Sequence, residues 1–377
     1  MMQASIGEHP ATVEEAVAAA ATLLEGARLA LVFGLVDGTV EAQRAAARVA
    51  ESLRGAIDVA LTPGRRAALA AFAQAGLVTS SLGALRTQAD LVVFWGCDPD
   101  RTHPGFKARY LEGRDQGRRV VVEVGEARGP ALGDERVALA SAQELGALVA
   151  LRALVRGRRV EKAMAAPLGL PLEALRGLAA QLGGCAYGVI VYDGDPPLDR
   201  PAPERAWALG MLAREASRKG CVRLFAVRAP GNAVGAENVL TWRTGFPSAV
   251  SFTRGAPLHH PRDWSAEALL RRGDVDAALL VGAEPSSVLS AQAQAKLARI
   301  PTVRLCARAE GSDAHAVFIA TAPLRATPGC VFRMDGIALR QEPSGPDRAA
   351  APGLPTQAAV LERILAAVQT RGGARAS

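Results

Sequence analysis

Short apolar runs that alternate with helix-like stretches constrain the fold of this chain more than any other feature. Such runs occur in "ARLALVFGL" (27–35), "IDVAL" (57–61), "ADLVVFWG" (89–96) and "RRVVVEVG" (118–125), and Ala-rich helical patterns such as "EAQRAAARVAESLRG" (41–55) separate them. Apolar runs of this length between helices are typical of parallel strands that are buried on both faces. The sequence therefore predicts an α/β fold with a mainly parallel sheet.

A second series of strands and helices follows from residue 185, with apolar runs in "CAYGVIVYDGD", "VRLFAV", "VDAALLVGAEP", "IPTVRLCA" and "AVFIATA". Ala89–Asp100 and Val275–Ser286 share one pattern, in which an Asp precedes an apolar strand that ends in Gly, two further residues and Pro. Ligands of open α/β sheets sit at the carboxyl ends of such strands. We expect two doubly wound domains, residues 27–150 and 151–340, with segments that can be exchanged between them. A helix capped by Thr12 and Glu15 within residues 1–26 precedes them, and a helix with a loose tail, residues 341–377, follows.

The charge and composition restrict the class of partner. The chain has 377 residues, a net charge of +7 and a pI of about 9.6, and aromatic residues make up 4%. The Arg-rich composition is explained either by a GC-rich genome or by an acidic partner. Basic residues are spread out without interleaved aromatic residues, which argues against nucleic acid. No apolar run reaches the about 18 residues of a membrane span, and the first residues lack the basic region of a signal peptide, so we expect a cytoplasmic protein.

Standard catalytic and nucleotide-binding motifs are missing from the sequence. It contains no GxGxxG after a strand, no GxxxxGK[ST], no HExxH and no GxSxG, which disfavours NAD, flavin and ATP binding. The cysteines are widely spaced and form neither a CxxC pair nor a zinc pattern; they are Cys97, Cys185, Cys221, Cys306 and Cys330.

Two loops carry the residues that come closest to a chemical site. Cys97 follows a strand and a glycine, so it is either a nucleophile or metal ligand or, as we favour, a small apolar residue in a tight loop. The stretch Phe252–Trp264 contains Arg254, His259 and His260 and is too long for a tight hairpin. Such loops tend to be functional or to form interfaces. The adjacent histidines point opposite ways in an extended segment, which disfavours one shared metal.

Three blocks resemble the B subunit of formylmethanofuran dehydrogenase, a molybdopterin- or tungstopterin-containing oxidoreductase of the formate dehydrogenase type. They are "DLVVFWGCDPDRTHPGFKARY" (90–110), "ENVLTWRTGFPSAVSFTRGAPLHHP" (237–261) and "FRMDGIALR" (332–340), and "GLVDGTVEAQRAA" (34–46) is similar to the start of the family's first pterin-binding domain. The resemblance implies two doubly wound, mainly parallel sheets with helices on both faces, related to the central domains of molybdopterin oxidoreductases.

The chain departs from this family where the redox chemistry resides. The family carries clustered cysteines for a [4Fe–4S] cluster near its N-terminus and a Cys-His pair after the second strand, whose thiolate binds the metal. Leu61 and Thr62 stand near the second position, and no cysteine precedes Cys97. Loss of the thiolate removes a soft metal ligand. We therefore expect no catalytic residue, cofactor or metal in this chain, and only a vestigial pterin pocket, formed by Gly34, Leu61, Thr62, Gly96, Asp98 and Arg254, the last as the counterpart of an active-site arginine. We expect the emptied pocket to have collapsed.

This combination is similar to the B subunit of the bacterial formyltransferase/hydrolase complexes of methylotrophs. The resemblance implies a non-redox structural subunit of a complex that converts formyl-tetrahydromethanopterin to formate via methylofuran in one-carbon metabolism. Its partners would be the hydrolase (A), C and formyltransferase (D) subunits, with the metal in the hydrolase, and its arginines would suit the polyglutamate arm of methylofuran. The alternative is an active tungsten- or molybdenum-pterin formylmethanofuran dehydrogenase subunit.

Overall fold

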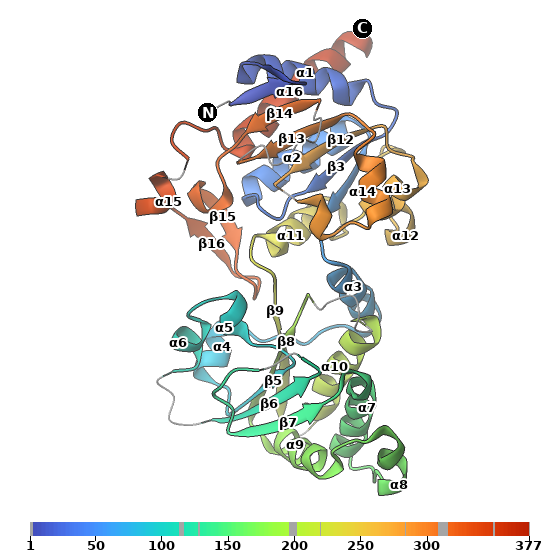
Figure 1. Cartoon of the computed structure of the whole chain (residues 1–377), viewed down its shortest axis with the longest axis vertical. Helices are drawn as coiled ribbons and strands as arrows, with labels where there is room; N and C mark the ends of the chain where they lie inside the picture. Colours follow the sequence, from blue (N-terminus) through green and yellow to red (C-terminus); the bar gives the residue numbers. More distant parts are fainter. Residues whose placement is uncertain are drawn as a thin grey trace. The chain divides into compact units, whose positions relative to one another are not determined.

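The computed structural model divides the chain into two compact units (Figure 1). Unit 1 comprises Met1–Leu61 and Gly231–Ser377, and unit 2 comprises Thr62–Pro230. The described residues are 3–112, 117–126, 129–195, 202–218, 220–282, 284–307, 316–349 and 351–376. Each unit has its own sheet and its own core.

The described part of unit 1 contains a nine-stranded sheet whose centre is parallel. Strands β4, β3, β12, β13 and β14 are parallel neighbours, and antiparallel strands extend both edges. In spatial order the strands are β11 (Leu258–His259), β10 (Val250–Ser251), β4 (Ala56–Val59), β3 (Ala30–Gly34), β12 (Ala277–Val281), β13 (Thr302–Cys306), β14 (Val317–Ala320), β1 (Ala4–Ile6) and β2 (His9–Pro10). The chain runs from β3 to β4 in one direction and from β12 to β14 in the other, which is the doubly wound order.

Helices cover both faces of the unit 1 sheet. The central strands are buried along their whole length, as near-continuous apolar strands of a parallel sheet must be. One face packs on α13 and α14 through alternate strand residues such as Leu31 and Phe33, and the other is covered by α1, α2 and α16. The helices of this unit are α1 (Val13–Glu25), α2 (Val40–Ser52), α11 (Ala233–Thr244), α12 (Pro261–Trp264), α13 (Ala266–Arg272), α14 (Ala291–Leu297), α15 (Gly345–Ala349) and α16 (Gln357–Ala376), with η3 (Pro285–Ser287) and η4 (Leu324–Ala326).

A separate antiparallel hairpin also belongs to unit 1. It consists of β15 (Gly329–Phe332) and β16 (Ala338–Gln341), which pair only with each other among the described strands. A hairpin of this size cannot bury its own apolar side chains, so its position depends on contacts to the rest of unit 1.

Unit 2 is a five-stranded sheet in which every described strand pair is parallel. In spatial order the strands are β7 (Glu135–Leu139), β6 (Arg118–Val124), β5 (Leu91–Trp95), β8 (Tyr187–Asp193) and β9 (Cys221–Val227). One face packs on α7, α9 and α10, and the short helices α4 and α6 cover the other, where Phe106 lies 6.2 Å from Phe225. The helices are α3 (Pro63–Ala75), α4 (Leu82–Thr87), α5 (Pro99–Thr102), α6 (Phe106–Tyr110), α7 (Glu144–Val155), α8 (Lys162–Ala165), α9 (Leu172–Gly184) and α10 (Ala202–Ala216), with η1 (Ser141–Gln143) and η2 (Ala166–Leu168).

The internal repeat expected from the sequence is present, with one copy in each unit. Asp90 accepts hydrogen bonds from two successive backbone N–H groups at the start of β8, at 2.7 and 2.8 Å. Asp276 does the same at the start of β3, at 3.0 and 2.9 Å. Each strand then ends in a glycine of positive φ, Gly96 at 57° and Gly282 at 53°, where an L side chain would be strained. The repeat thus consists of equivalent strands that lie beside the point where each sheet reverses its winding.

The predicted domain boundaries at residues 26, 150 and 340 differ from the division in the structure. The N-terminal strands β3 and β4 pair with β12 and β10, so they belong to one sheet with residues from the C-terminal half. The second unit is an insertion between β4 and α11. The N-terminal helix is as expected, because Thr12 and Glu15 form a reciprocal capping box. Within the described residues, no helix is long and apolar enough to cross a bilayer.

Candidate functional site at the carboxyl ends of the two sheets

The switch point of the unit 1 sheet lies between β3 and β12, where the loops after both strands meet. Gly34 ends β3, and Leu61, which is 2% exposed, follows β4 on the same edge. In doubly wound sheets this is the place where ligands bind. The residues here decide whether unit 1 retains a binding crevice.

Two buried amides fix the loop after β3. The Gln43 Nε2 group lies 3.0 Å from each of three backbone oxygens, those of Leu35, Gly38 and Asn232. Asn232 in turn donates from Nδ2 to the Gly38 oxygen at 2.9 Å and accepts from the Phe332 N–H at 2.8 Å. Both amides are at most 1% exposed. The loop is therefore held by side chains of the same unit.

Gln357, the first residue of α16, occupies the switch point of unit 1. A methyl group at Gly38 would come within 3.0 Å of its Oε1 atom, and one at Gly282 within 2.8 Å of its Nε2 atom. Gln357 is 5% exposed, and its Oε1 atom has no hydrogen-bond partner among the described residues. The two glycines thus make room for an amide of this chain between the loops after β3 and β12.

The switch point of unit 2 lies between β5 and β8. Cys97 is 8% exposed and its thiol donates to the Val191 oxygen at 3.5 Å, so the sulfur is turned into the sheet. Asp98 caps α5 by accepting from the Asp100 N–H at 3.1 Å. These positions fit the interpretation of Cys97 as a small residue in a tight loop.

Asp195, which follows β8, is the centre of the polar contacts at this edge. It accepts from the Thr62 hydroxyl at 2.9 Å, from Arg228 Nε at 3.2 Å and from the Ala229 N–H at 2.8 Å. The Thr62 hydroxyl also accepts from the Arg65 N–H at 3.1 Å and so caps α3. Thr62, which was expected near the metal-binding thiolate of the redox family, is therefore committed to a local hydrogen-bond network.

A buried ion pair lies beneath this edge. Arg205 Nε is 2.7 Å from Glu144 Oε1, and the side chains are 2% and 1% exposed. The same oxygen accepts from the Trp95 indole N–H at 2.8 Å, and Arg205 also donates to the Asp193 oxygen at 3.0 Å. Complete burial raises the pKa of Tyr192, whose ring lies 5.8 Å from the Arg205 guanidinium. Charged and aromatic side chains of unit 2 thus fill the space below its switch point.

The six predicted pocket residues fall into three groups. Gly34 and Leu61 lie on the carboxyl edge of the unit 1 sheet, and Thr62, Gly96 and Asp98 lie on that of unit 2. Arg254 is exposed in the turn after β10. Because β10 runs antiparallel to β4, this turn lies at the amino-terminal edge of the unit 1 sheet, opposite Gly34. The structure does not bring Arg254 together with the other two residues of its own unit.

The histidine-rich stretch forms a short hairpin, contrary to the expectation of a long loop. Strands β10 and β11 pair within it, and α12 follows directly. The His259 ring stacks on Phe246 at 4.7 Å and its Nδ1 atom lies 2.8 Å from the Ser248 oxygen, whereas His260 pairs with Asp263. In the part of the chain that the structure describes, no three His, Cys, Asp or Glu side chains are placed to hold a metal ion.

Several residues that shape these edges were missed by sequence reasoning. Asp195 had a usable signal, because "YDGDPP" resembles "FWGCDPD": in both, a strand is followed by Gly, Asp and Pro, with one Cys between Gly and Asp in the second. Gln357 and Arg205 had none, since each sits in an ordinary helical pattern and acquires its contacts only through tertiary packing.

Comparison with known proteins identifies relatives of this chain, although no family model matches it. The B subunit of tungsten-containing formylmethanofuran dehydrogenase 2 is 27% identical in Methanocaldococcus jannaschii, over 87% of this chain and 77% of the relative. The Methanococcus maripaludis protein of the same name is 25% identical, over 86% and 77%. The B subunit of the formyltransferase/hydrolase complex Fhc of Methylorubrum extorquens is 29% identical over 299 residues, 76% of each chain.

A solved structure matches the fold over nearly the whole chain. A chain in the crystal structure of the formyltransferase/hydrolase complex FhcABCD from Methylorubrum extorquens, in complex with methylofuran, has a TM-score of 0.78 at 24% identity, with 98% of this chain and 99% of that chain covered. The predicted fold class is confirmed. The chain is an α/β protein of the type found in the B subunit of formylmethanofuran dehydrogenase. Within this type it is a homologue of the Fhc B subunit.

Proposed function

We propose that this chain is a non-redox, structural subunit of a formyltransferase/hydrolase complex, one that converts formyl-tetrahydromethanopterin to formate via methylofuran. The homology to the Fhc B subunit supports membership of the complex. The observation that carries the non-redox assignment is the Thr62–Asp195 hydrogen bond of 2.9 Å. It stands where the resemblance to the redox family expects a metal-binding thiolate.

The residues of this chain do not fit a metal-bearing pterin of the redox type. The resemblance implies a cysteine thiolate as the protein ligand of the metal at this position, and the threonine hydroxyl, which is engaged with Asp195 and the Arg65 N–H, supplies no sulfur. In unit 1, the Gln357 side chain occupies the space between Gly38 and Gly282. These contacts support the proposal that the chain's own side chains fill the former pocket.

The proposed partners are the hydrolase (A), C and formyltransferase (D) subunits, with the metal in the hydrolase, in a cytoplasmic complex. Methylofuran is the expected coenzyme, and tetrahydromethanopterin carries the incoming formyl group. The net charge of +7 favours an approach of the anionic polyglutamate arm of methylofuran. The guanidinium groups of this chain's arginines can pair with the carboxylates of this arm.

The alternative function is that of an active tungsten- or molybdenum-pterin formylmethanofuran dehydrogenase subunit. The names of two relatives favour it, because both are subunits of tungsten-containing enzymes. The two functions differ in metal content and in the role of Thr62.

Coexpression of the chain with the other three subunits tests the proposal. We expect the four chains to copurify, to release formate from formyl-tetrahydromethanopterin, and to contain no stoichiometric tungsten or molybdenum by mass spectrometry. Thr62→Ala should leave formate release per assembled complex within about twofold of wild type, with Thr62→Ser as the control that keeps the helix cap. Stoichiometric tungsten or molybdenum together with a pterin would establish the alternative.

A further inference from the structure

The β15–β16 hairpin is attached to unit 1 along β15 and, at the end of β16, through the Gln341 side chain, which donates to the Leu324 and Thr327 oxygens at 2.5 and 2.8 Å. The Glu41 carboxylate accepts from the Cys330 N–H through both oxygens, each at 3.1 Å. The Asn232 side chain accepts from the Phe332 N–H at 2.8 Å. These bonds satisfy the outer edge of β15, whereas the outer edge of β16 faces solvent, with Ala338, Leu339 and Arg340 exposed. The hairpin is thus a fixed arm with one open edge.

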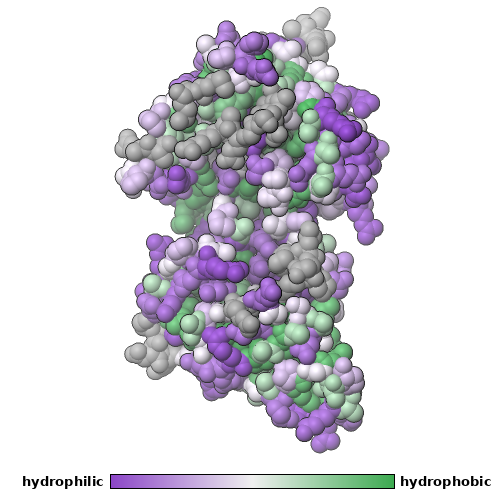
Figure 2. Space-filling model, in the orientation of Figure 1, coloured by the Kyte–Doolittle hydropathy of each residue, from purple (hydrophilic) through white to green (hydrophobic). Residues whose placement is uncertain are grey.

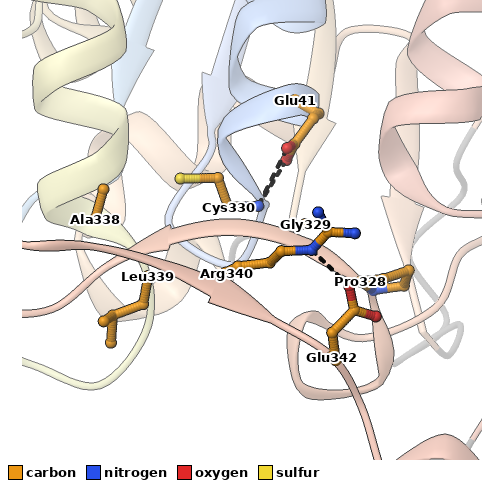
Figure 3. A pocket seen from close by; sticks show the side chains of 8 residues that line it. All are labelled: Glu41, Pro328, Gly329, Cys330, Ala338, Leu339, Arg340 and Glu342. Atoms are coloured by element: carbon orange, nitrogen blue, oxygen red, sulfur yellow. Dashed lines mark hydrogen bonds and ion pairs between the residues drawn. The ribbon is translucent and has the colours of Figure 1, made fainter.

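Large apolar side chains remain exposed on this arm and on the neighbouring end of α11. Ile337 and Leu339 are 46% and 43% exposed. Trp242 is 63% exposed, and its ring contacts that of Phe332 in a tilted arrangement, with the ring centroids 5.7 Å apart. In Figure 3, Leu339 points away from the side of the ribbon that carries Cys330 and Ala338. Figure 2 shows hydrophobic surface over the region in which Figure 1 draws this hairpin. Contiguous apolar surface around an ordered element marks an interaction site rather than chance exposure.

A cavity of about 530 Å³ lies beside the arm, and charged side chains form part of its lining (Figure 3). Glu41, Arg340 and Glu342 contribute its charged groups. Arg340 pairs with Glu342 at 2.7 Å, whereas Glu41 has no cationic partner among the described residues. This lining carries a net negative charge in a chain whose overall charge is positive. It is complementary to a lysine or arginine side chain of a partner.

We propose that the β15–β16 hairpin, together with Trp242, is the arm by which this chain docks into an apolar groove of another subunit of its complex. The groove covers the exposed side chains of Ile337, Leu339 and Trp242, and a basic residue at its rim enters the cavity beside Glu41. This inference rests on the proposed function, because it requires a heteromeric partner. A two-stranded hairpin with exposed large apolar side chains is stabilised by a partner that covers them.

The test compares two matched double variants in the coexpressed complex. Trp242→Ser/Leu339→Ser removes apolar side chains that are 63% and 43% exposed from the arm region. Val149→Ser/Met164→Ser removes apolar side chains that are 60% and 68% exposed from α7 and α8 of unit 2. Affinity of the tagged full-length chain for the other subunits is measured by biolayer interferometry, and assembly by native mass spectrometry. We expect the arm variant to bind at least about 10-fold more weakly and the control to bind like wild type. Both should keep the circular-dichroism melting temperature of the wild-type chain.

A single variant, Glu41→Gln, keeps an acceptor for the Cys330 N–H but removes the charge. It should weaken binding by about threefold and reduce its dependence on salt, which keeps the inference testable if the double variant unfolds. Unchanged affinity of the folded arm variant would overturn the inference while leaving the proposed function intact. Failure of the wild-type chain to bind any of the subunits would overturn both. A dimer of the wild-type chain that the arm variant breaks would show a second copy in the partner's place and also overturn the inference.

Discussion

The buried ion pair of unit 2 gives the sharpest prediction about stability. Glu144→Leu leaves the Arg205 guanidinium, which is 2% exposed, without its carboxylate and the Trp95 N–H without its acceptor. Removal of one partner of a buried pair costs about 3–5 kcal/mol, and an unpaired indole N–H adds about 1 kcal/mol. We therefore expect a loss of about 4–6 kcal/mol in the free energy of unfolding. Glu144→Gln, which keeps one acceptor oxygen, should lose about half as much.

The double variant Glu144→Leu/Arg205→Leu separates pairing from packing. Because replacement of a whole buried pair by apolar groups is often close to neutral, its cost should fall at least about 2 kcal/mol short of the sum of the single variants. Urea unfolding followed by tryptophan fluorescence and circular dichroism measures these energies, with the transition of unit 2 reported by Trp95 and Trp207. The reasoning would be refuted if the double variant lost as much free energy of unfolding as the two single variants together. It would also be refuted if Glu144→Leu lay within about 1 kcal/mol of wild type.

Three further outcomes follow from the contacts described above. Asp90→Ala and Asp276→Ala should each lower the free energy of unfolding in urea by about 1 kcal/mol. The corresponding Asn variants should lose about half of that, because an amide oxygen still accepts one of the two hydrogen bonds. Equal losses for the Ala and Asn variants would contradict the paired hydrogen bonds. Burial, with a smaller effect of Asp90, raises the pKa of the Cys185 thiol to about 11. At pH 8 the thiolate fraction of Cys185 is then about 100-fold below that of an ordinary thiol. Mass spectrometry should therefore detect labelling of Cys185 by iodoacetamide only as the pH rises towards 11. Rapid labelling at pH 8 would be inconsistent with this pKa. Gly282→Ala should lower the free energy of unfolding by about 1–2 kcal/mol, because Gly282 has a positive φ and a methyl group there would contact Gln357. Adding Gln357→Ala should recover part of this loss. If nothing is recovered, the Gln357 side chain does not lie against Gly282.

Periodicity in the sequence was sufficient to predict the parallel strands other than β7, and most helices, because a buried strand of a parallel sheet is a local apolar run. The short antiparallel strands and β7 were not predicted. The assignment of strands to sheets was not predictable in the same way. β3 and β4 are separated from β12 by more than two hundred residues, yet they belong with it to one sheet, in which β3 is its direct neighbour. The insertion of a whole unit between β4 and α11 is marked by a Pro-Gly pair at each boundary, Pro63-Gly64 and Pro230-Gly231, but the same pair also occurs within the units, for example at Pro104-Gly105.

The candidate site could be predicted only at the positions that follow a strand. Gly34, Gly96 and Asp98 lie where a strand-end motif puts them, on a carboxyl edge of their sheet. Arg254 was assigned from a resemblance, and its placement depended on the direction of β10, a strand of two residues. The contacts of Gln357 and Arg205 arise from helices that approach the edges from elsewhere in each fold, and helical periodicity carries no information about that approach.

The polar contacts at the two switch points bear on whether the fold needs a ligand there. Buried amides and charges are costly unless they are hydrogen-bonded, and a crevice built for a cofactor leaves such groups to the cofactor. Here Gln43 and Asn232 bind the loop after β3, and Glu144 binds Arg205 and Trp95, all within their own units. Four buried polar atoms of the side chains at these edges have no hydrogen-bond partner among the described residues, namely Gln357 Oε1, Gln43 Oε1, the Tyr192 hydroxyl and Arg205 Nη2, and buried water is a sufficient partner for such groups. Most polar groups at each sheet edge are therefore bound within their own unit, which is the arrangement that the proposed structural role requires.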